Sequence, residues 1–422
     1  MKIIATHVDD SFDELRARID VERRRRGKAI DRYFYRSHLV FETELTNLIF
    51  KSWIYAAHIS EVPNPGDFTL FEVGEDSLII TRDKEGKIRA LMNVCRHRGA
   101  RVCEKEKGNT KTFVCPYHKW TYNLDGTLRA ARHMDMLDGF DAADYPLKEA
   151  KVCVYMGLIF VNFDQNAGDF LGPLSNVEAQ LGAYELDKAK IIRKETYKVD
   201  ANWKFCLENY LECYHCTAAH PHYAKMHTLE DLYCNVKDQL DEMLKRAPEI
   251  TGVPGIEGEY KKIYHEAESF GACVYTSRYG LYDGYLTGSQ DGKPVAPLMG
   301  KIKGYDGGVG DFQFGPLSFM LNYPDHCVMY RFIPRGLTET DMQIVWYVNG
   351  DAEEGKDYDA DKVAWLWHYT TLEDEFIIKR NSEGANSQFF EPGPYHPEYE
   401  ETLQDFIDWY LATLERAAAR KG

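Results

Sequence analysis

Hydrophobic and polar positions follow different periods along the chain, and each change of period marks a new part. Residues 11–35 place Phe12 and Leu15 at helical spacing among many charges, which predicts a helix followed by a connecting arm. Residues 41–58 continue with a second helical stripe. The chain is therefore expected to open with a helical arm over residues 1–45.

A β-rich domain is expected next, over residues 46–166. Short segments of β character that are separated by turns containing glycine predict strands there. They are residues 68–73, 77–81 and 88–94, with a turn at 83–86, and a long apolar strand at 152–163.

The second half mixes both periods and predicts an α+β catalytic domain over residues 167–422. Helical spacing occurs in residues 201–221, 361–380 and 400–419. Residues 327–334 and 342–349 alternate well enough to form adjacent antiparallel strands. Residues 230–315 carry little periodicity, so long loops and strands are expected there.

Composition narrows the class of protein. The chain has 422 residues, of which 44% are hydrophobic, enough for two or three packed domains. Its net charge of −16 argues against binding to nucleic acid or to an anionic membrane. No window approaches the ~20 apolar residues of a membrane span, and the start MKIIATHVDD has too short an apolar run for a signal peptide. Ten cysteines without paired spacing predict reduced thiols and hence a cytoplasmic protein.

Cysteine and histidine occur in two mixed pairs within residues 95–118. Cys95 and His97 form a C-x-H pair, and Cys115 and His118 form a C-x-x-H pair. Two thiolates can hold one iron of a 2Fe–2S cluster while two imidazoles hold the other, which is the ligation of a Rieske centre. A structural zinc site takes the same ligand types, but zinc fingers usually group cysteine with cysteine and histidine with histidine. The order of the ligands therefore favours the Rieske cluster.

Residues 201–221 carry a second candidate site. Glu212 lies three residues before His215, and His220 follows five residues later. On a regular helix the two histidines diverge by about 140°, so both reach one metal only if the helix distorts or ends near His220. Pro221 gives a reason for such an end, because proline disfavours the α region for the residue before it. Two histidines and one carboxylate form the ligand set of non-haem Fe(II) oxygenases, so a carboxylate must come from elsewhere in the chain.

Together these motifs resemble those of the oxygenase (α) component of Rieske non-haem iron oxygenases, also called ring-hydroxylating oxygenases. The resemblance covers nearly the whole chain. It rests on the two cluster pairs, on N-W-K at 202–204, on E-N-Y-x-E-x-Y-H-x-x-x-x-H from Glu208, and on Glu373-Asp374. It implies a helix-grip catalytic domain with an antiparallel sheet and long C-terminal helices. It also implies Asp374 as the third iron ligand, with Glu373 and Glu375 as competing choices.

The resemblance further implies that Glu212 links two metal centres across a subunit boundary. In the family, an acid three residues before the first histidine joins that iron ligand to a cluster histidine of the next subunit in a trimer. These residues correspond here to His215 and His118. Aspartate is commoner at this place, and Glu212 within E-C-Y-H is similar to the branch that oxidises quaternary ammonium compounds.

As the resemblance implies, this is a multicomponent enzyme with a Rieske 2Fe–2S cluster and mononuclear Fe(II) as cofactors. No G-x-G-x-x-G follows a strand, so NAD(P)H electrons are expected from a separate flavin- or ferredoxin-type reductase. A small β subunit stays an open alternative. The substrate is expected to be a small aromatic or N-methylated compound. This leaves open cis-dihydroxylation, as in aromatic hydrocarbon catabolism, and monooxygenation with demethylation. A Rieske electron carrier without catalysis is a third interpretation, which the ~250 residues beyond the cluster domain disfavour.

Aromatic residues and methionines after His220 are the candidates for a substrate pocket. Aromatic rings suit either a flat arene or, through cation–π contact, an ammonium group. The candidates are Tyr223, Met226, Tyr279, Tyr282, Tyr285, Phe312, Phe314, Phe319 and Met320. His222 and His227 are expected to be structural or surface residues, and Cys103 a buried thiol rather than a fifth cluster ligand.

Overall fold

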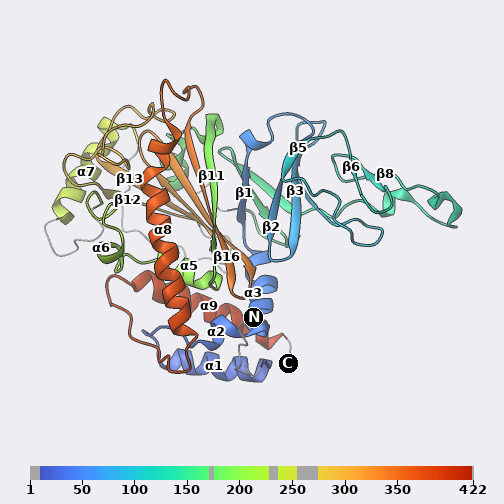
Figure 1. Ribbon diagram of the computed structural model, residues 1–422, viewed down its shortest axis with the longest axis horizontal. Coiled ribbons are helices and arrows are strands. Elements are labelled where there is room, and N and C mark those ends of the chain that lie inside the picture. Colours follow the sequence, from blue (N-terminus) through green and yellow to red (C-terminus); the bar gives the residue numbers. More distant parts are fainter. Residues whose placement is uncertain (1–9, 171–174, 228–235, 254–273, 421–422) are drawn as a thin grey trace.

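The computed structural model describes residues 10–170, 175–227, 236–253 and 274–420. A β-rich lobe that contains β1 to β10 lies beside a large sheet flanked by long helices (Figure 1). Helices from both ends of the chain, α1 to α3 and α9, pack together below that sheet (Figure 1). Within the described residues, no helix combines the length and the apolar character that crossing a membrane requires.

A six-stranded antiparallel sheet forms the centre of the larger lobe, in the order β11-β16-β15-β14-β13-β12. Its strands are β11 (Ala189–Val199), β12 (Val274–Gly280), β13 (Gly308–Phe314), β14 (Ser318–Asn322), β15 (Cys327–Gly336) and β16 (Glu339–Asn349). The pairing of β15 with β16 confirms the two adjacent strands predicted from alternation. Because side chains alternate between the faces of a strand, Tyr330 meets Trp367 of helix α8 on one face, and Phe314 meets Phe160 of the β-rich lobe on the other.

Two helices of the larger lobe position the candidate iron ligands. α8 (Ala360–Ala385) lies along β11 and contacts α5 (Trp203–Tyr210). The side chain of Asp359 caps α8 by accepting two backbone N–H groups of its first turn. α8 is longer than the helix predicted over residues 361–380, and α9 (Glu401–Ala419) confirms the last predicted helix.

The segment of residues 230–315 contains a helix that the sequence pattern did not predict. α7 (Val236–Ile250) lies within it and carries Pro248, a residue that argues against a helix interior. Residues 228–235 and 254–273, which the same prediction covers in part, lie outside the described residues. The other short helices are α4 (Ser175–Gly182), α6 (Cys216–Ala219) and the 3₁₀ turns η1 (Ile49–Lys51), η2 (Ile59–Glu61), η3 (Met134–Met136), η4 (Ala142–Asp144) and η5 (Leu186–Lys188).

The β-rich lobe contains three antiparallel sheets, ordered β4-β3-β2-β5, β6-β7-β8 and β1-β10-β9. The strands are β1 (Ile54–His58), β2 (Asp67–Val73), β3 (Asp76–Arg82), β4 (Ile88–Met92), β5 (Lys107–Asn109), β6 (Phe113–Val114), β7 (Thr121–Tyr122), β8 (Leu128–Ala130), β9 (Lys151–Tyr155) and β10 (Leu158–Asn162). β2, β3 and β4 confirm the strands predicted before the first cysteine pair. The domain limits predicted at residues 46 and 166 stay a prediction.

Two predictions for this lobe are wrong. Residues 41–58 are not one helix, because α3 (His38–Asn47) ends and the strand β1 follows. All five residues of β1 are buried, and periodicity cannot tell such a run from a helical stripe. Residues 152–163 form the hairpin β9–β10 rather than one strand, with positive φ at both turn residues, Met156 and Gly157. A methionine with positive φ is uncommon, so no ordinary turn signal marks this place.

A buried ion pair joins the N-terminal helices to α5. Two helices precede α3 in the chain, α1 (Phe12–Arg24) and α2 (Tyr33–Arg36). Glu44 of α3 is fully buried and accepts hydrogen bonds from Trp203 Nε1 at 2.8 Å and Lys204 Nζ at 2.7 Å. Asn202 caps α5 by accepting the backbone N–H of Lys204 at 3.2 Å. The N-W-K motif therefore fixes the start of the helix that leads to the candidate iron ligands.

Candidate metal centres

The segment that leads to the first candidate iron ligand is not one helix. α5 ends at Tyr210, and α6 follows after a break and ends at His220, which confirms the prediction that the helix distorts or ends near His220. The side chain of Glu212 stabilises the break, because its Oε2 accepts the backbone N–H groups of Tyr214 and His215, the latter at 3.2 Å.

A single-turn helix then determines the positions of the two histidines. α6 has His215 at its N cap and His220 at its C cap. His220 has a φ of −119° and a ψ of 76°, outside the α region, as the following Pro221 favours. The two histidines thus lie at opposite ends of one turn, and the divergence expected from a continuous helix does not arise.

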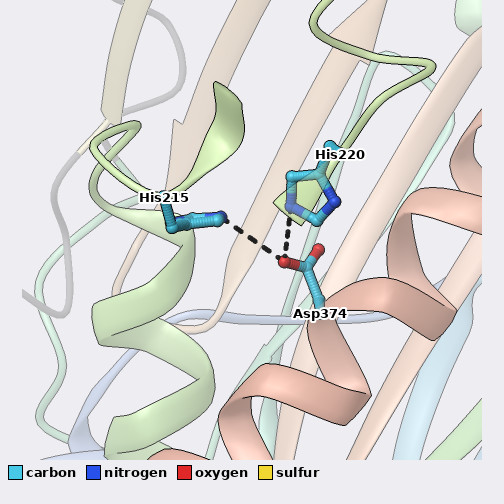
Figure 2. Close-up of side chains that lie close together, drawn as sticks. All are labelled: His215, His220 and Asp374. Carbon is cyan, nitrogen blue, oxygen red and sulfur yellow. Dashed lines mark ion pairs between the residues drawn. The ribbon is translucent and has the colours of Figure 1, made fainter. Parts of the chain in front are cut away.

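The structure brings the three predicted iron ligands into one cluster. Figure 2 shows His215 and His220 with their rings turned toward Asp374, which lies on α8. Asp374 Oδ1 is 3.0 Å from Nε2 of His220 and 3.5 Å from Nε2 of His215. One ligand atom from each of the three residues lies within 4.8 Å of the others. Among the described contacts, the competing Glu373 reaches only His220, and Glu375 reaches neither histidine.

The donor set fits a divalent iron. Asp374 Oδ1 is buried and accepts no hydrogen bond, although both imidazoles are near. A buried carboxylate oxygen without a donor is costly, and a cation between the three residues would stabilise it. Two imidazoles and one carboxylate are the facial ligand set of non-haem Fe(II), which leaves positions for O2 and substrate.

The cluster also favours positive charge. Burial disfavours the charged ring of His215, but pairing with Asp374 and Glu212 outweighs burial and raises its pKa to about 10. Burial likewise opposes ionisation of Asp374, yet pairing with the two histidines holds its pKa below the usual value. Protons or a metal cation can supply the positive charge that this carboxylate attracts.

Each imidazole has a second carboxylate on its other nitrogen. Glu212 Oε1 is 2.5 Å from Nδ1 of His215, and Glu373 Oε2 is 2.9 Å from Nδ1 of His220. Such contacts fix the orientation of the ring and place the proton on Nδ1, which leaves Nε2 for a metal. Glu373 therefore acts on the cluster through His220 rather than as a ligand.

The cluster opens into a cavity. The cavity wall includes the rings of Tyr210, Tyr223, Tyr279 and Trp367 and the side chain of Asp311. Tyr223 and Tyr279 are among the predicted pocket residues, and the other three are not. Trp367 lies two helical turns before Asp374 on α8, so its place on the same helix face was a usable signal.

The remaining predicted pocket residues do not line this cavity. Phe312, Phe314 and Met320 project from the opposite face of the sheet, where Phe314 packs on Phe160 with 5.4 Å between ring centroids. Strand residues one position apart face opposite sides, so composition alone could not choose the correct face. The others, Met226, Tyr282, Tyr285 and Phe319, lie outside the cavity wall.

The two Cys/His loops in the β-rich lobe are built alike. The N–H of Cys95 donates to the carbonyl of Ala100 at 2.8 Å, and the N–H of Cys115 donates to the carbonyl of Trp120 at 2.8 Å. In each loop the residue before that acceptor has a positive φ, 77° at Gly99 and 63° at Lys119. Each loop therefore closes on itself through its own backbone.

Within these loops the thiols lie together and the imidazoles lie together. His97 Nδ1 and His118 Nδ1 are 3.1 Å apart, and the His97 ring is exposed. Burial raises the pKa of the Cys115 thiol, and the neighbouring Cys95 adds to the shift. In the described residues, no three of these four ligand atoms converge within 4.8 Å, as a single zinc ion would require. A sulfur pair and a separate nitrogen pair fit the two irons of a Rieske cluster.

The two candidate centres lie in different lobes. The loops around β6 and β8 project away from α5, α6 and α8 (Figure 1). No hydrogen bond or ion pair between described residues joins Glu212 to His118, so one chain does not build the predicted bridge by itself. Glu212 and His215 also line a second hollow, on the side of Tyr395.

The other singled-out residues lie outside both clusters. His227 is fully buried with Nε2 2.8 Å from the hydroxyl of Tyr323, and burial lowers its pKa to about 3. His222 packs edge-on against Trp365. Cys103 is half-buried, and burial raises the pKa of its thiol. The surroundings of His222 and His227 agree with structural roles, whereas Cys103, predicted to be a buried thiol, is only partly buried.

Comparison with known proteins places the chain in a family. The model of the Rieske [2Fe-2S] domain matches residues 52–141, and that of the ring hydroxylating alpha subunit (catalytic domain) matches residues 186–416. The glycine betaine monooxygenase oxygenase subunit of Chromohalobacter salexigens is 32% identical over 418 residues, which are 98% of this chain and 93% of that protein.

Solved structures share the fold at lower identity. A quaternary ammonium Rieske monooxygenase in complex with an inhibitor has a TM-score of 0.67 at 22% identity, covering 92% of this chain and 96% of its own. Naphthalene 1,2-dioxygenase from Rhodococcus sp. bound to indole has a TM-score of 0.66 at 19% identity, covering 96% and 98%. The chain therefore belongs to the ring-hydroxylating alpha subunits, as the oxygenase component of a Rieske multicomponent oxygenase that uses a 2Fe–2S cluster and mononuclear iron.

Proposed function

We propose that this oxygenase component is a monooxygenase that demethylates a quaternary ammonium compound. The observation that carries the proposal is the cavity beside His215, His220 and Asp374, whose wall holds three tyrosine rings and the indole of Trp367. Aromatic faces attract cations, so this wall suits a methylated ammonium group. The activity named for the relative that aligns over nearly the whole chain supports this substrate class over an arene.

The iron-site residues have separate tasks in this proposal. His215, His220 and Asp374 would hold Fe(II), which supplies O2 activation and carbon hydroxylation when it is bound. Glu212 and Glu373 keep both imidazoles in the orientation that ligation needs. The aromatic wall would hold an N-methyl carbon next to the cluster. Hydroxylation of that carbon gives an N-hydroxymethyl product, which breaks down to formaldehyde and the demethylated amine.

Electron supply requires other proteins and other copies of the chain. We propose that a separate reductase delivers NAD(P)H electrons to the β-rich lobe, where four residues would hold the Rieske cluster, a one-electron carrier. They are Cys95, His97, Cys115 and His118. In a trimer, His118 of one copy would meet Glu212 in the hollow of the next copy, and Glu212 would join it to His215. The separation of the lobes within one chain supports this arrangement (Figure 1).

Product analysis tests the reaction. Purified, iron-loaded protein with a reductase and NADH is offered trimethylammonium compounds and, separately, benzoate and naphthalene. We expect oxygen uptake with an ammonium compound only, with formaldehyde released in about equal amount to the oxygen consumed. A cis-diol formed from an arene, without formaldehyde from any ammonium compound, would overturn the proposal.

Mixed oligomers test the transfer between copies. Asp374→Ala and His118→Ala are each expected to be inactive alone, because one lacks an iron ligand and the other a cluster ligand. Co-expressed with different affinity tags and purified as mixed oligomers, they are expected to regain part of the activity. Mixed oligomers that stay inactive would show that transfer does not cross between copies.

A further inference from the structure

One carboxylate in the cavity wall has no part in the iron site. Asp311 lies on β13, opposite Ser277 of β12 and Leu321 of β14, and both Asp311 and Leu321 line the cavity. Since cross-strand partners face the same side of a sheet, this group points toward the side of α5 and α8 that carries the iron ligands.

Two other buried acids of the larger lobe lie next to basic side chains. Asp306 forms a buried ion pair with Arg278, and Asp325 lies 2.8 Å from Nδ1 of His326. No described lysine, arginine or histidine forms an ion pair with Asp311. A carboxylate in the wall of a cavity is costly when no cation is near it among the described residues, and a positively charged ligand in the cavity would stabilise it.

The negative charge of Asp311 acts on aromatic side chains of the cavity wall. Burial raises the pKa of Asp311 to about 7, and a hydrogen bond with Ser277 offsets this only in part. After burial, the charge of Asp311 is the next cause that raises the pKa of Tyr210. It also contributes to the raised pKa of Tyr279, again after burial. The carboxylate therefore acts on two of the rings that face the cavity.

A carboxylate and several aromatic faces around one cavity are the two kinds of group that bind a methylated ammonium ion. The other cavity carboxylates, Glu212 and Asp374, are engaged with imidazoles. We propose that Asp311 is the specificity-determining residue of the enzyme, and that it binds the ammonium group of the substrate while an N-methyl carbon faces the iron ligands. This inference rests on the proposed function and adds the residue that selects the charge of the substrate.

The test compares ammonium ligands with carbon isosteres, in which a tert-butyl group replaces the trimethylammonium group. The probes are glycine betaine with 3,3-dimethylbutanoate, and choline with 3,3-dimethylbutan-1-ol, in iron-loaded enzyme, with dissociation constants from calorimetry. Asp311→Asn keeps the shape of the side chain and removes its charge. We expect it to weaken binding of the preferred ammonium ligand by about thirtyfold or more, and to change binding of the isostere by less than about threefold.

Two further variants control the comparison. Asp283→Asn removes one negative charge from an exposed position after β12, and it is expected to leave both dissociation constants unchanged. Asp311→Glu keeps the charge and is expected to retain the preference for the ammonium ligand. Iron content and thermal unfolding of each variant confirm that the site is intact.

The outcomes separate this inference from the proposed function. An Asp311→Asn enzyme that discriminates ammonium from isostere as the native enzyme does, or that loses both ligands equally with iron retained, overturns the role of Asp311. In that case the native enzyme still releases formaldehyde from an ammonium compound. If the native enzyme releases none from any ammonium compound, the proposed function itself fails.

Discussion

The two candidate metal centres of this chain are built in opposite ways. The proposed Rieske ligands lie within residues 95–118, in two loops that each close through their own backbone hydrogen bonds. The proposed iron ligands His215 and His220 lie at the two ends of the short helix α6, and Asp374 comes from α8, far along the chain. The first centre depends on local geometry, whereas the second exists only while α5 and α8 pack together. A change that damages the larger lobe should therefore remove the mononuclear iron and leave the Rieske cluster in place.

Removing the proposed third iron ligand should give the largest effect. Asp374→Ala takes away the carboxylate that reaches both imidazoles, so we expect loss of the mononuclear iron and of essentially all turnover. The visible spectrum of the Rieske cluster should persist, because its ligands lie in the other lobe. Glu375→Ala, on the same turn of α8, serves as the matched control and should keep its iron. Normal iron content in Asp374→Ala would contradict the assignment.

Breaking the buried ion pair at the start of α5 should give the second-largest effect. Lys204→Met leaves Glu44 buried without its cation, and removing one partner of such a pair costs about 3–5 kcal/mol of unfolding free energy. Thermal or urea unfolding measures the loss. Lys379→Met, which breaks the exposed contact with Asp200, should cost less than about 1 kcal/mol. Equal effects of the two changes would mean that the buried pair does not support the iron-site helix.

Glu212→Gln should affect the link between the centres rather than either centre alone. The amide keeps the size of the side chain but removes the charge beside His215, and the expected loss of turnover is about 10–100-fold. Iron analysis and the Rieske spectrum should show both metals present. Undiminished turnover would remove Glu212 from the path between the centres.

The pH dependence of binding gives the smallest expected effect. Burial raises the pKa of Asp311 to about 7, so this carboxylate is mostly charged at pH 8 and mostly protonated at pH 6. An ammonium ligand binds the charged form, so its affinity relative to the carbon isostere should fall by about tenfold from pH 8 to pH 6. Other titratable groups also face the cavity and affect the binding of both ligands, so the ratio of the two dissociation constants reduces this shared effect. These groups are Glu212, His215, His220 and Asp374. A ratio that keeps the same pH dependence in Asp311→Asn would assign the titration to another group.

The sequence predicted best what depends on neighbours along the chain. The strands around β3 follow from alternation and turns, and the Rieske domain follows from a short motif whose loops close locally. Predictions failed where tertiary packing determines the local structure. The buried run of β1 has no period that distinguishes it from a helix. The turn at Met156 has no ordinary turn residue before its glycine.

The iron site was predictable only in part, for a related reason. The spacing of His215 and His220 indicated that a regular helix could not serve, but not that Glu212 would end α5 so early. Asp374 came from the family resemblance, because no local pattern distinguishes it from Glu373 and Glu375. The cavity residue Asp311 depends on which face of β13 turns toward α8, and a strand by itself does not determine that.

Quantitative metal and sulfide analysis tests the central claim, that one chain holds two different iron centres, most directly. Freshly purified protein should contain about three iron atoms and about two acid-labile sulfides per chain, and Asp374→Ala should lose about one iron while keeping both sulfides. Zinc in place of the iron–sulfur pair, or about two irons per chain with no change in Asp374→Ala, would contradict it.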